Sequence, residues 1–170
     1  KNKFVDWDKR NKELEEVCDK YRKEDGSWDV IVPSSGGKDS SYVSYILKEK
    51  FGMHPLTVTM APALPTDLGR ENLFNMTYTG QDNLLFTPNG IIHRKISKES
   101  LIKFGDNFIP FAFGQIHIPL QCAVKFNIPF VIFGENGELE YGGSVQNYNK
   151  STFEASTIPS GKFSGLRTPG

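Results

Sequence analysis

The sequence predicts an α/β fold with a doubly wound, mostly parallel sheet, because short apolar runs alternate along the chain with segments of helical periodicity. A loop rich in serine and glycine directly follows the first apolar run and precedes a helical segment. The 170 residues are 38% hydrophobic and 24% charged, as in globular proteins. Together these observations favour one ordinary globular domain over a disordered or membrane-embedded chain.

The expected elements follow from apolar periodicity and from the turn residues between them. A charged amphipathic helix is expected over residues 6–24, before the break at Asp25-Gly26-Ser27. Short runs rich in β-branched and apolar residues predict strands over residues 28–33, 54–59, 83–87 and 128–133. Further helices are expected over residues 40–50, 66–80, 97–104 and 113–126.

Ligands of doubly wound sheets bind beyond the carboxyl ends of the strands, near the switch in strand order. Polar segments follow three of the expected strands, after Val32, Val58 and Phe133. We therefore expect these three strand ends to gather around one crevice.

The composition changes from Gly142 onward to Gly, Ser, Asn, Thr and Pro, without sustained periodicity. Such a stretch is too long for a structureless loop inside a compact domain. We expect a core domain over residues 1–145, followed over residues 146–170 by a linker or by the edge of a C-terminal substrate domain. No internal repeat is present in the sequence.

Charge and cysteine content exclude several classes of protein. Lys plus Arg (20) balance Asp plus Glu (20), so no net field attracts nucleic acid or an anionic membrane. No apolar run approaches the roughly 20 residues that span a bilayer, and no signal-peptide segment opens the chain, so a cytoplasmic location is expected. Cys18 and Cys122 form no metal-ligand pattern and are expected to be free thiols, and no histidine has metal-ligand spacing.

The loop Ser34-Ser35-Gly36-Gly37-Lys38-Asp39-Ser40 carries the chemistry that the sequence predicts. Two adjacent glycines let the backbone turn tightly and bring its N–H groups close to a bound anion. The helix that follows adds unpaired N–H groups and the positive end of its dipole. Ser35 and Ser40 offer hydroxyls and Lys38 a positive charge, so the loop is suited to phosphate or pyrophosphate. It lacks the spacing of the Walker A loop, which disfavours γ-phosphate transfer.

The segment SGGKDS resembles the signature of the PP-loop, or N-type ATP pyrophosphatase, superfamily. The resemblance implies the adenine-nucleotide α-hydrolase fold and a reaction in which ATP is cleaved to AMP and pyrophosphate while a substrate oxygen is adenylylated. It assigns pyrophosphate binding to residues 35–40, with Lys38 and Asp39 acting in catalysis and Asp39 placing Mg²⁺. Segments 32–34 and 57–59, including Ser34 and Thr59, would border the adenine and ribose.

More of the chain resembles one branch of that superfamily, the N-acetyl sugar amidotransferases of bacterial O-antigen and flagellin-glycan synthesis. The segments that carry this likeness occur in order at residues 28–33, 35–42, 55–59, 66–72, 86–90, 93–95 and 134–143. The last, GENGELEYGG, is the most specific of them. The resemblance implies that ATP adenylylates the acetamido oxygen of a nucleotide-linked N-acetyl sugar and that ammonia then displaces AMP, leaving an acetamidino group.

The resemblance also implies that ammonia comes from a separate glutaminase, like that of the glutaminase and synthase pair of histidine biosynthesis. Neither cysteine of this chain lies in a nucleophile elbow, which agrees with an ammonia source outside it. Glu135, in the turn after the expected fourth strand, could orient Mg²⁺ or accept a proton from ammonia, and Gly134 would adjoin the cofactor.

The remaining candidates would contact the sugar substrate. Arg70 has forked donors suited to a phosphate or a carboxylate, and its alternative is an ordinary helix-surface arginine. Gln115 could contact substrate or act as an interior polar cap. The other substrate candidates are Asn136, Glu140, Gly142 and Gly143.

The same loop is compatible with two alternative functions. A tRNA-modifying PP-loop enzyme would need an RNA-binding surface, which the neutral net charge and the lack of paired cysteines disfavour. A non-catalytic ATP-binding module would bind ATP without releasing pyrophosphate.

Overall fold

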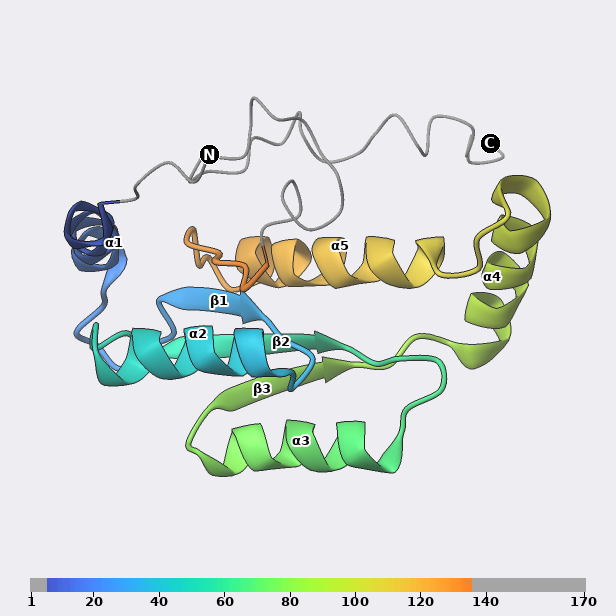
Figure 1. Ribbon diagram of the computed structural model, residues 1–170, viewed down its shortest axis with the longest axis horizontal. Helices are drawn as coiled ribbons and strands as arrows, with labels where there is room; N and C mark the ends of the chain where they lie inside the picture. The colour runs from blue at the N-terminus through green and yellow to red at the C-terminus, as the bar shows by residue number, and fades with distance from the viewer. Residues whose placement is uncertain (1–5, 136–170) are drawn as a thin grey trace. The chain divides into compact units, whose positions relative to one another are not determined.

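The structure, a computed structural model, describes residues 6–135. Two compact units divide the chain, Lys1–Gly134 and Glu135–Gly170, and all helices and strands named here belong to the first (Figure 1). They are α1 (Trp7–Tyr21), β1 (Val30–Pro33), α2 (Lys38–Glu49), β2 (Pro55–Met60), α3 (Asp67–Tyr78), β3 (Asp82–Phe86), α4 (Gly90–Phe104) and α5 (Ile109–Lys125).

The sheet is parallel, with β2 between β1 and β3. On the other side of β1, Val131 forms an isolated parallel bridge with Ile31. The N–H of Ile31 donates to the Phe130 carbonyl and the N–H of Ile132 donates to the Ile31 carbonyl, each at 2.9 Å. The order across the sheet is therefore β3, β2, β1 and then the segment at Val131. The expected α/β class with parallel strands is confirmed.

The expected fourth strand at residues 128–133 is wrong as a continuous strand, because only the bridge at Val131 forms. Neither Ile128 nor Pro129, the first two residues of this segment, has an N–H group that could donate to a carbonyl of β1. The N–H of Ile128 donates to the Ala123 carbonyl at the end of α5, and Pro129 has no N–H. The segment nevertheless occupies the expected place beside β1.

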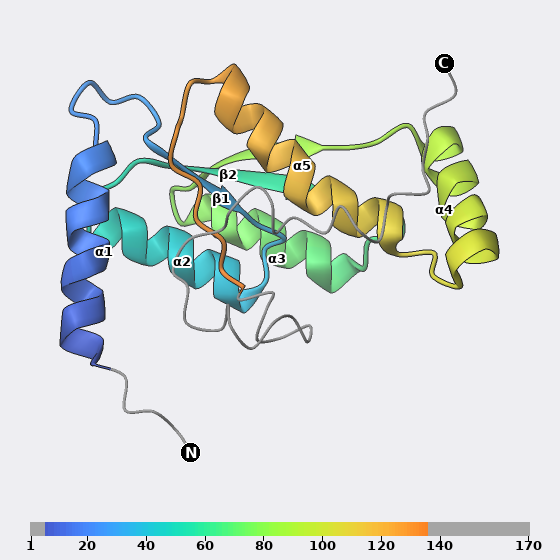
Figure 2. The ribbon, with the colours of Figure 1, turned by 90° about the horizontal axis from the view of Figure 1, so that it is seen from above.

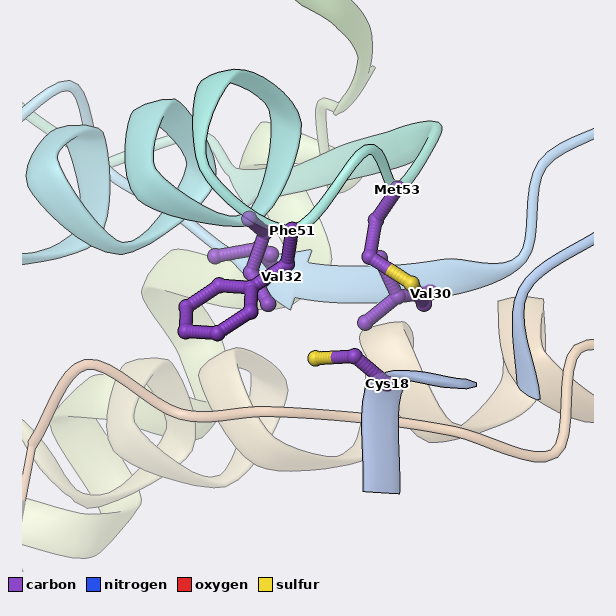
Figure 3. Packing of buried hydrophobic residues seen from close by; sticks show 6 residues of the cluster. Cys18, Val30, Val32, Phe51 and Met53 are labelled. Carbon is purple, nitrogen blue, oxygen red and sulfur yellow. The ribbon is translucent and has the colours of Figure 1, made fainter. Parts of the chain in front are cut away.

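Alternate residues of β1 point to opposite faces of the sheet, and both faces are covered by helices. Val30 and Val32 pack with Cys18 of α1 and with Leu47 of α2, and Phe51 and Met53 complete this cluster (Figure 3). On the other face, Ile31 packs with Leu56, Val58 and Ile128, and Ile118 and Cys122 of α5 cover them. Figures 1 and 2 show α2 and α3 on one side of the sheet and α5 on the other.

Three helices begin earlier than the sequence analysis expects. α4 begins at Gly90 rather than at residue 97, because the side chain of Asn89 caps it by accepting the N–H groups of Ile91 and Ile92. α5 begins at Ile109, with Pro110 in its first turn, where no helical partner for its nitrogen is needed. α2 begins at Lys38 rather than at residue 40, so Lys38 and the residue after it belong to the first turn.

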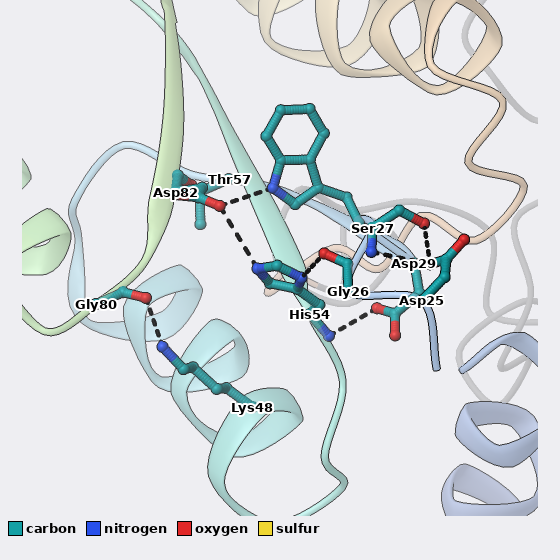
Figure 4. A network of polar contacts seen from close by, with 10 residues as sticks. Asp25, Gly26, Ser27, Asp29, Lys48, His54, Thr57, Gly80 and Asp82 are labelled. Carbon is teal, nitrogen blue, oxygen red and sulfur yellow. Dashed lines mark hydrogen bonds and ion pairs between the residues drawn. The ribbon is translucent and has the colours of Figure 1, made fainter. Parts of the chain in front are cut away.

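Polar contacts fasten the amino ends of the strands (Figure 4). The buried carboxylate of Asp29 accepts the His54 N–H at 2.8 Å. The carboxylate of Asp82 accepts the Trp28 indole N–H at 2.7 Å and lies 3.6 Å from Nε2 of His54. Nδ1 of His54 lies 2.8 Å from the Gly26 carbonyl. These contacts join all three strands at the end of the sheet opposite the Ser34–Ser40 loop.

Among residues 6–135, no helix is both long and apolar enough to cross a membrane.

Candidate functional site

The Ser34–Ser40 loop connects the carboxyl end of β1 to α2, and the side chain of Ser34 holds it together. Ser34 is buried, and its Oγ accepts the Gly36 N–H at 3.2 Å and donates to Oγ of Ser40 at 3.0 Å. Its own N–H donates to the Val58 carbonyl at 2.9 Å, which joins the loop to the end of β2. Ser34 is therefore placed to shape the loop from inside.

Gly36 brings the loop into direct contact with the backbone of α3. Its φ of 78° lies in the left-handed region that favours glycine. A Cβ atom at this position would lie only 2.8 Å from the backbone N and Cα of Leu73. Conformation and close packing thus both require glycine here.

The first turn of α2 presents backbone donors without a side-chain cap. Gly37 is the N-cap residue, and no side chain caps the helix there. The first N–H with a helical partner is that of Ser41, which donates to the Gly37 carbonyl at 3.1 Å. The preceding N–H groups and the positive end of the helix dipole form a site suited to an anion.

Two exposed charged side chains, Lys38 and Asp39, stand at this end of α2. Their side chains are 91% and 61% exposed, and Nζ of Lys38 lies 3.8 Å from Oδ1 of Asp39. An ion pair so exposed contributes little to stability, so both groups are available to a ligand.

The carboxyl ends of the strands meet at this loop, as the sequence analysis expects. Gly134 follows the segment that bridges to β1, and a Cβ atom there would lie 3.1 Å from the N and Cα of Ser40. The hydrogen bond from Ser34 to Val58 brings in the end of β2. The expected gathering of three strand ends is therefore confirmed for the segments after Val32, Val58 and Phe133.

Thr59 lies in β2, and its side chain is engaged within the sheet. It is 2% exposed, and its Oγ1 accepts a hydrogen bond from Nδ2 of Asn83 at 2.9 Å. That Thr59 lies beside the adenine of ATP stays a prediction. Its hydroxyl already accepts the hydrogen bond from Asn83.

The other predicted site residues are not part of the loop itself. Arg70 is on the exposed first turn of α3, with its guanidinium 3.5 Å from the Asp67 carboxylate. Gln115 is half-buried on α5, on the opposite face of the sheet from α2 and α3. Glu135 is exposed and opens the second compact unit, so its predicted catalytic role stays a prediction. Four more substrate candidates lie outside the described residues: Asn136, Glu140, Gly142 and Gly143.

The residues at the loop fit a phosphate ligand accompanied by Mg²⁺. Within residues 6–135 no group of three or more His, Cys, Asp or Glu side chains could hold a metal by itself. Mg²⁺ in nucleotide sites is commonly held by one or two carboxylates together with phosphate oxygens and water. Asp39 supplies one such carboxylate beside the backbone donors of α2.

A groove of about 490 Å³ opens between α2 and α3, beginning at the loop. Its lining consists of Gly36, Lys38, Ser41, Tyr42, Tyr45, Asn72, Asn75, Met76 and Thr79. The sequence alone does not predict this groove. Its signal in the sequence is weak: two tyrosines three residues apart on one helix, and two asparagines three apart on the next.

Comparison with known proteins adds one distant relative. No protein-family model matches the chain. A 79-residue segment, 46% of this chain, is 37% identical to the Methanocaldococcus jannaschii protein named "Uncharacterized protein MJ1599". The match spans only 28% of that relative's length, and its name assigns no activity. The chemistry of the site therefore has to be inferred from its own geometry.

Proposed function

We propose that this chain binds ATP at the Ser34–Ser40 loop and cleaves it between the α- and β-phosphates, to activate the acetamido group of an N-acetyl sugar for amidotransfer. The observation that carries the proposal is the uncapped first turn of α2 at the carboxyl end of β1, with Lys38 and Asp39 exposed beside it. The strand order supports assignment to the PP-loop fold. The helices α2 and α3, which connect β1, β2 and β3, lie on one face of the sheet, whereas α5, which leads to the segment on the other side of β1, lies on the opposite face (Figure 1).

The reaction begins when the acetamido oxygen of the sugar attacks the α-phosphorus of ATP. The bond between the α-phosphorus and the oxygen that joins it to the β-phosphate breaks, and pyrophosphate leaves. Ammonia then adds to the activated carbon, and AMP departs with the former acetamido oxygen, so that an acetamidino group remains. The nitrogen loses one proton to a base, for which Glu135 is the candidate in the sequence.

The residues of the loop have distinct parts in this scheme. The backbone N–H groups of the first turn of α2 and the ammonium of Lys38 bind the pyrophosphate, whose negative charge grows as it leaves. Asp39 would hold Mg²⁺, which supplies positive charge to the phosphate oxygens. Ser34 and Gly36 keep the loop in the shape that binding requires.

The proposal is tested by incubating the protein with ATP, Mg²⁺, ammonia and UDP-linked N-acetyl sugars and identifying the nucleotide products. AMP and pyrophosphate are expected in equal amounts with an amidinated sugar. Formation of ADP, or ATP binding without turnover for any sugar, would contradict the proposal and favour a different ATPase or a binding module. Salt-sensitive binding of tRNA would favour the tRNA-modifying alternative.

Lys38→Ala provides the sharpest residue test. Loss of a charged donor to the leaving group should lower kcat/KM for AMP formation by about a hundredfold. Thermal stability should barely change, because the Lys38 side chain is 91% exposed. Lys12→Ala, an exposed lysine on α1, is the matched control and should retain the wild-type rate. Equal rates for the two variants would remove Lys38 from the site.

A further inference from the structure

The groove between α2 and α3 has the composition of a binding site for a small polar ring. Tyr42 and Tyr45 stand three residues apart on α2 and are 65% and 52% exposed. Aromatic side chains offer a flat apolar surface with a polar hydroxyl at its edge. Met76, 5% exposed, is an apolar side chain on the α3 side of the same groove.

The opposite wall supplies amide groups. Asn72 and Asn75 are exposed and three residues apart on α3, so they share one face of that helix. An asparagine side chain offers both hydrogen-bond donors and an acceptor. Within the described part of the chain, neither side-chain amide makes a hydrogen bond to another residue, so both are available to a ligand.

Charge in the groove is confined to one end. Lys38, beside the anion-binding turn of α2, is the charged residue among the lining side chains of this groove in residues 6–135. The remaining polar groups are hydroxyls and amides. This distribution suits a ligand whose body is neutral and whose negative charge lies toward the loop, and it is poorly suited to a nucleic-acid strand, which needs a row of cations.

We propose that this groove binds the sugar ring of the acceptor, a neutral N-acetylhexosamine whose nonpolar face stacks on Tyr42 or Tyr45 and whose hydroxyl and acetamido groups bond to Asn72 and Asn75. The proposal rests on the amidotransferase function proposed above. Gly36 and Lys38 line both the groove and the phosphate loop, so the sugar and the reacting phosphate would share one continuous site.

Two variants and one control test the groove. Tyr45→Ala and Asn75→Ala each remove one group from opposite walls. Tyr78→Ala removes a tyrosine of α3 that is 84% exposed and does not line the groove. Binding of UDP-N-acetylglucosamine and of free N-acetylglucosamine would be followed by calorimetry and by saturation-transfer NMR, with ATP affinity measured separately and folding checked by thermal melting.

Each groove variant should weaken binding of both sugar probes about tenfold, equivalent to about 1.4 kcal/mol. Affinity for ATP should change less than about twofold, and Tyr78→Ala should leave both affinities unchanged. Unchanged sugar affinity in both folded variants, or absence of sugar binding by the wild type, would overturn the proposal. A loss of ATP affinity in its place would assign the groove to the nucleotide and also overturn it.

The two proposals fail in distinguishable ways. If the protein forms AMP and pyrophosphate but the groove variants keep the wild-type KM for the sugar, the groove assignment is wrong and the proposed function stands. If the wild type forms no AMP yet binds the sugar probes through Tyr45 and Asn75, the proposed reaction is wrong and the groove is a sugar site.

Discussion

Gly36 carries two constraints at once, a left-handed φ and a contact with α3 that leaves no room for a Cβ atom. Gly134 is constrained in a milder way, since a Cβ there would lie 3.1 Å from the first turn of α2. The glycines of the site thus set how closely its elements approach one another. In the proposed function, Lys38 and the backbone N–H groups bind the ligand.

Gly36→Ala should destabilise the fold and also separate the loop from α3. An alanine in the left-handed region costs about 1–2 kcal/mol, and displacement of Leu73 adds to that cost. Gly26→Ala is the matched control, because Gly26 has a similar φ of 77° and open space around it. Chemical denaturation should show a larger loss for Gly36→Ala. Equal losses in the free energy of unfolding would mean that the close contact between Gly36 and α3 does not add to the cost of the alanine.

The two cysteines should differ in reactivity. Cys18 has no exposed surface in the cluster between α1 and β1, whereas Cys122 is half-buried on α5. Burial raises the pKa of both thiols above the ordinary value of 9.0, so both stay protonated and slow to react near neutral pH. A thiol reagent with mass-spectrometric readout should modify Cys122 first and Cys18 only on unfolding. Labelling of Cys18 first would contradict the packing in Figure 3.

The same pKa shifts set a dependence of stability on pH. In the unfolded chain the thiols ionise at their ordinary pKa, while in the fold they remain protonated to higher pH. The unfolded state therefore binds fewer protons above about pH 9, and the free energy of unfolding should fall as pH rises through that range. Below that range the thiols should contribute no slope.

The place of the loop between β1 and α2 could be predicted from the sequence because its signal is local. Two glycines, two hydroxyls and a lysine before a helix indicate an anion site whatever the rest of the fold. The contact of Gly36 with Leu73 could not be predicted, since it depends on where α3 packs. The groove that Asn72 and Asn75 line could not be predicted for the same reason, because its other wall is formed by Tyr42 and Tyr45 on another helix.

Helix boundaries in this fold depend on caps that are easy to overlook in a sequence. The expected start of α4 at residue 97 missed the first half of the helix, where Ile91 and Ile92 are exposed and give no amphipathic signal. Asn89 is the cap that begins it, through hydrogen bonds of 3.0 and 3.2 Å to the next turn. Capping thus outweighs periodicity in placing this element.

Asn89→Ala should therefore lower the free energy of unfolding by about 1 kcal/mol, the usual cost of losing an N-cap side chain. Asn107→Ala, which changes an exposed asparagine in the turn between α4 and α5, serves as the control and should have a smaller effect. Hydrogen exchange should also be faster at the N–H groups of Ile91 and Ile92. Unchanged exchange there would mean that α4 is held at Gly90 by other contacts.

Across the described fold, the candidate site lies at one end of the sheet, and the polar contacts that join the three strands lie at the other. Asp29, His54 and Asp82 hold the amino ends of the strands, while the loop after β1 lies at their carboxyl ends (Figure 4). Helices on both faces bury β1 and β2 completely enough that their apolar runs predict strands reliably. β3 lies at the edge, with Leu85 52% exposed, and the sequence could not reveal this because edge position depends on strand order.

The destination of the acetamido oxygen is the measurement that tests the account most directly. The sugar nucleotide would be prepared with ¹⁸O in its acetamido carbonyl and turned over with ATP, Mg²⁺ and ammonia. Attack of that oxygen on the α-phosphorus predicts one ¹⁸O atom in the AMP and none in the pyrophosphate. Unlabelled AMP, or label in orthophosphate alongside ADP, would contradict cleavage at the Ser34–Ser40 loop by the proposed route.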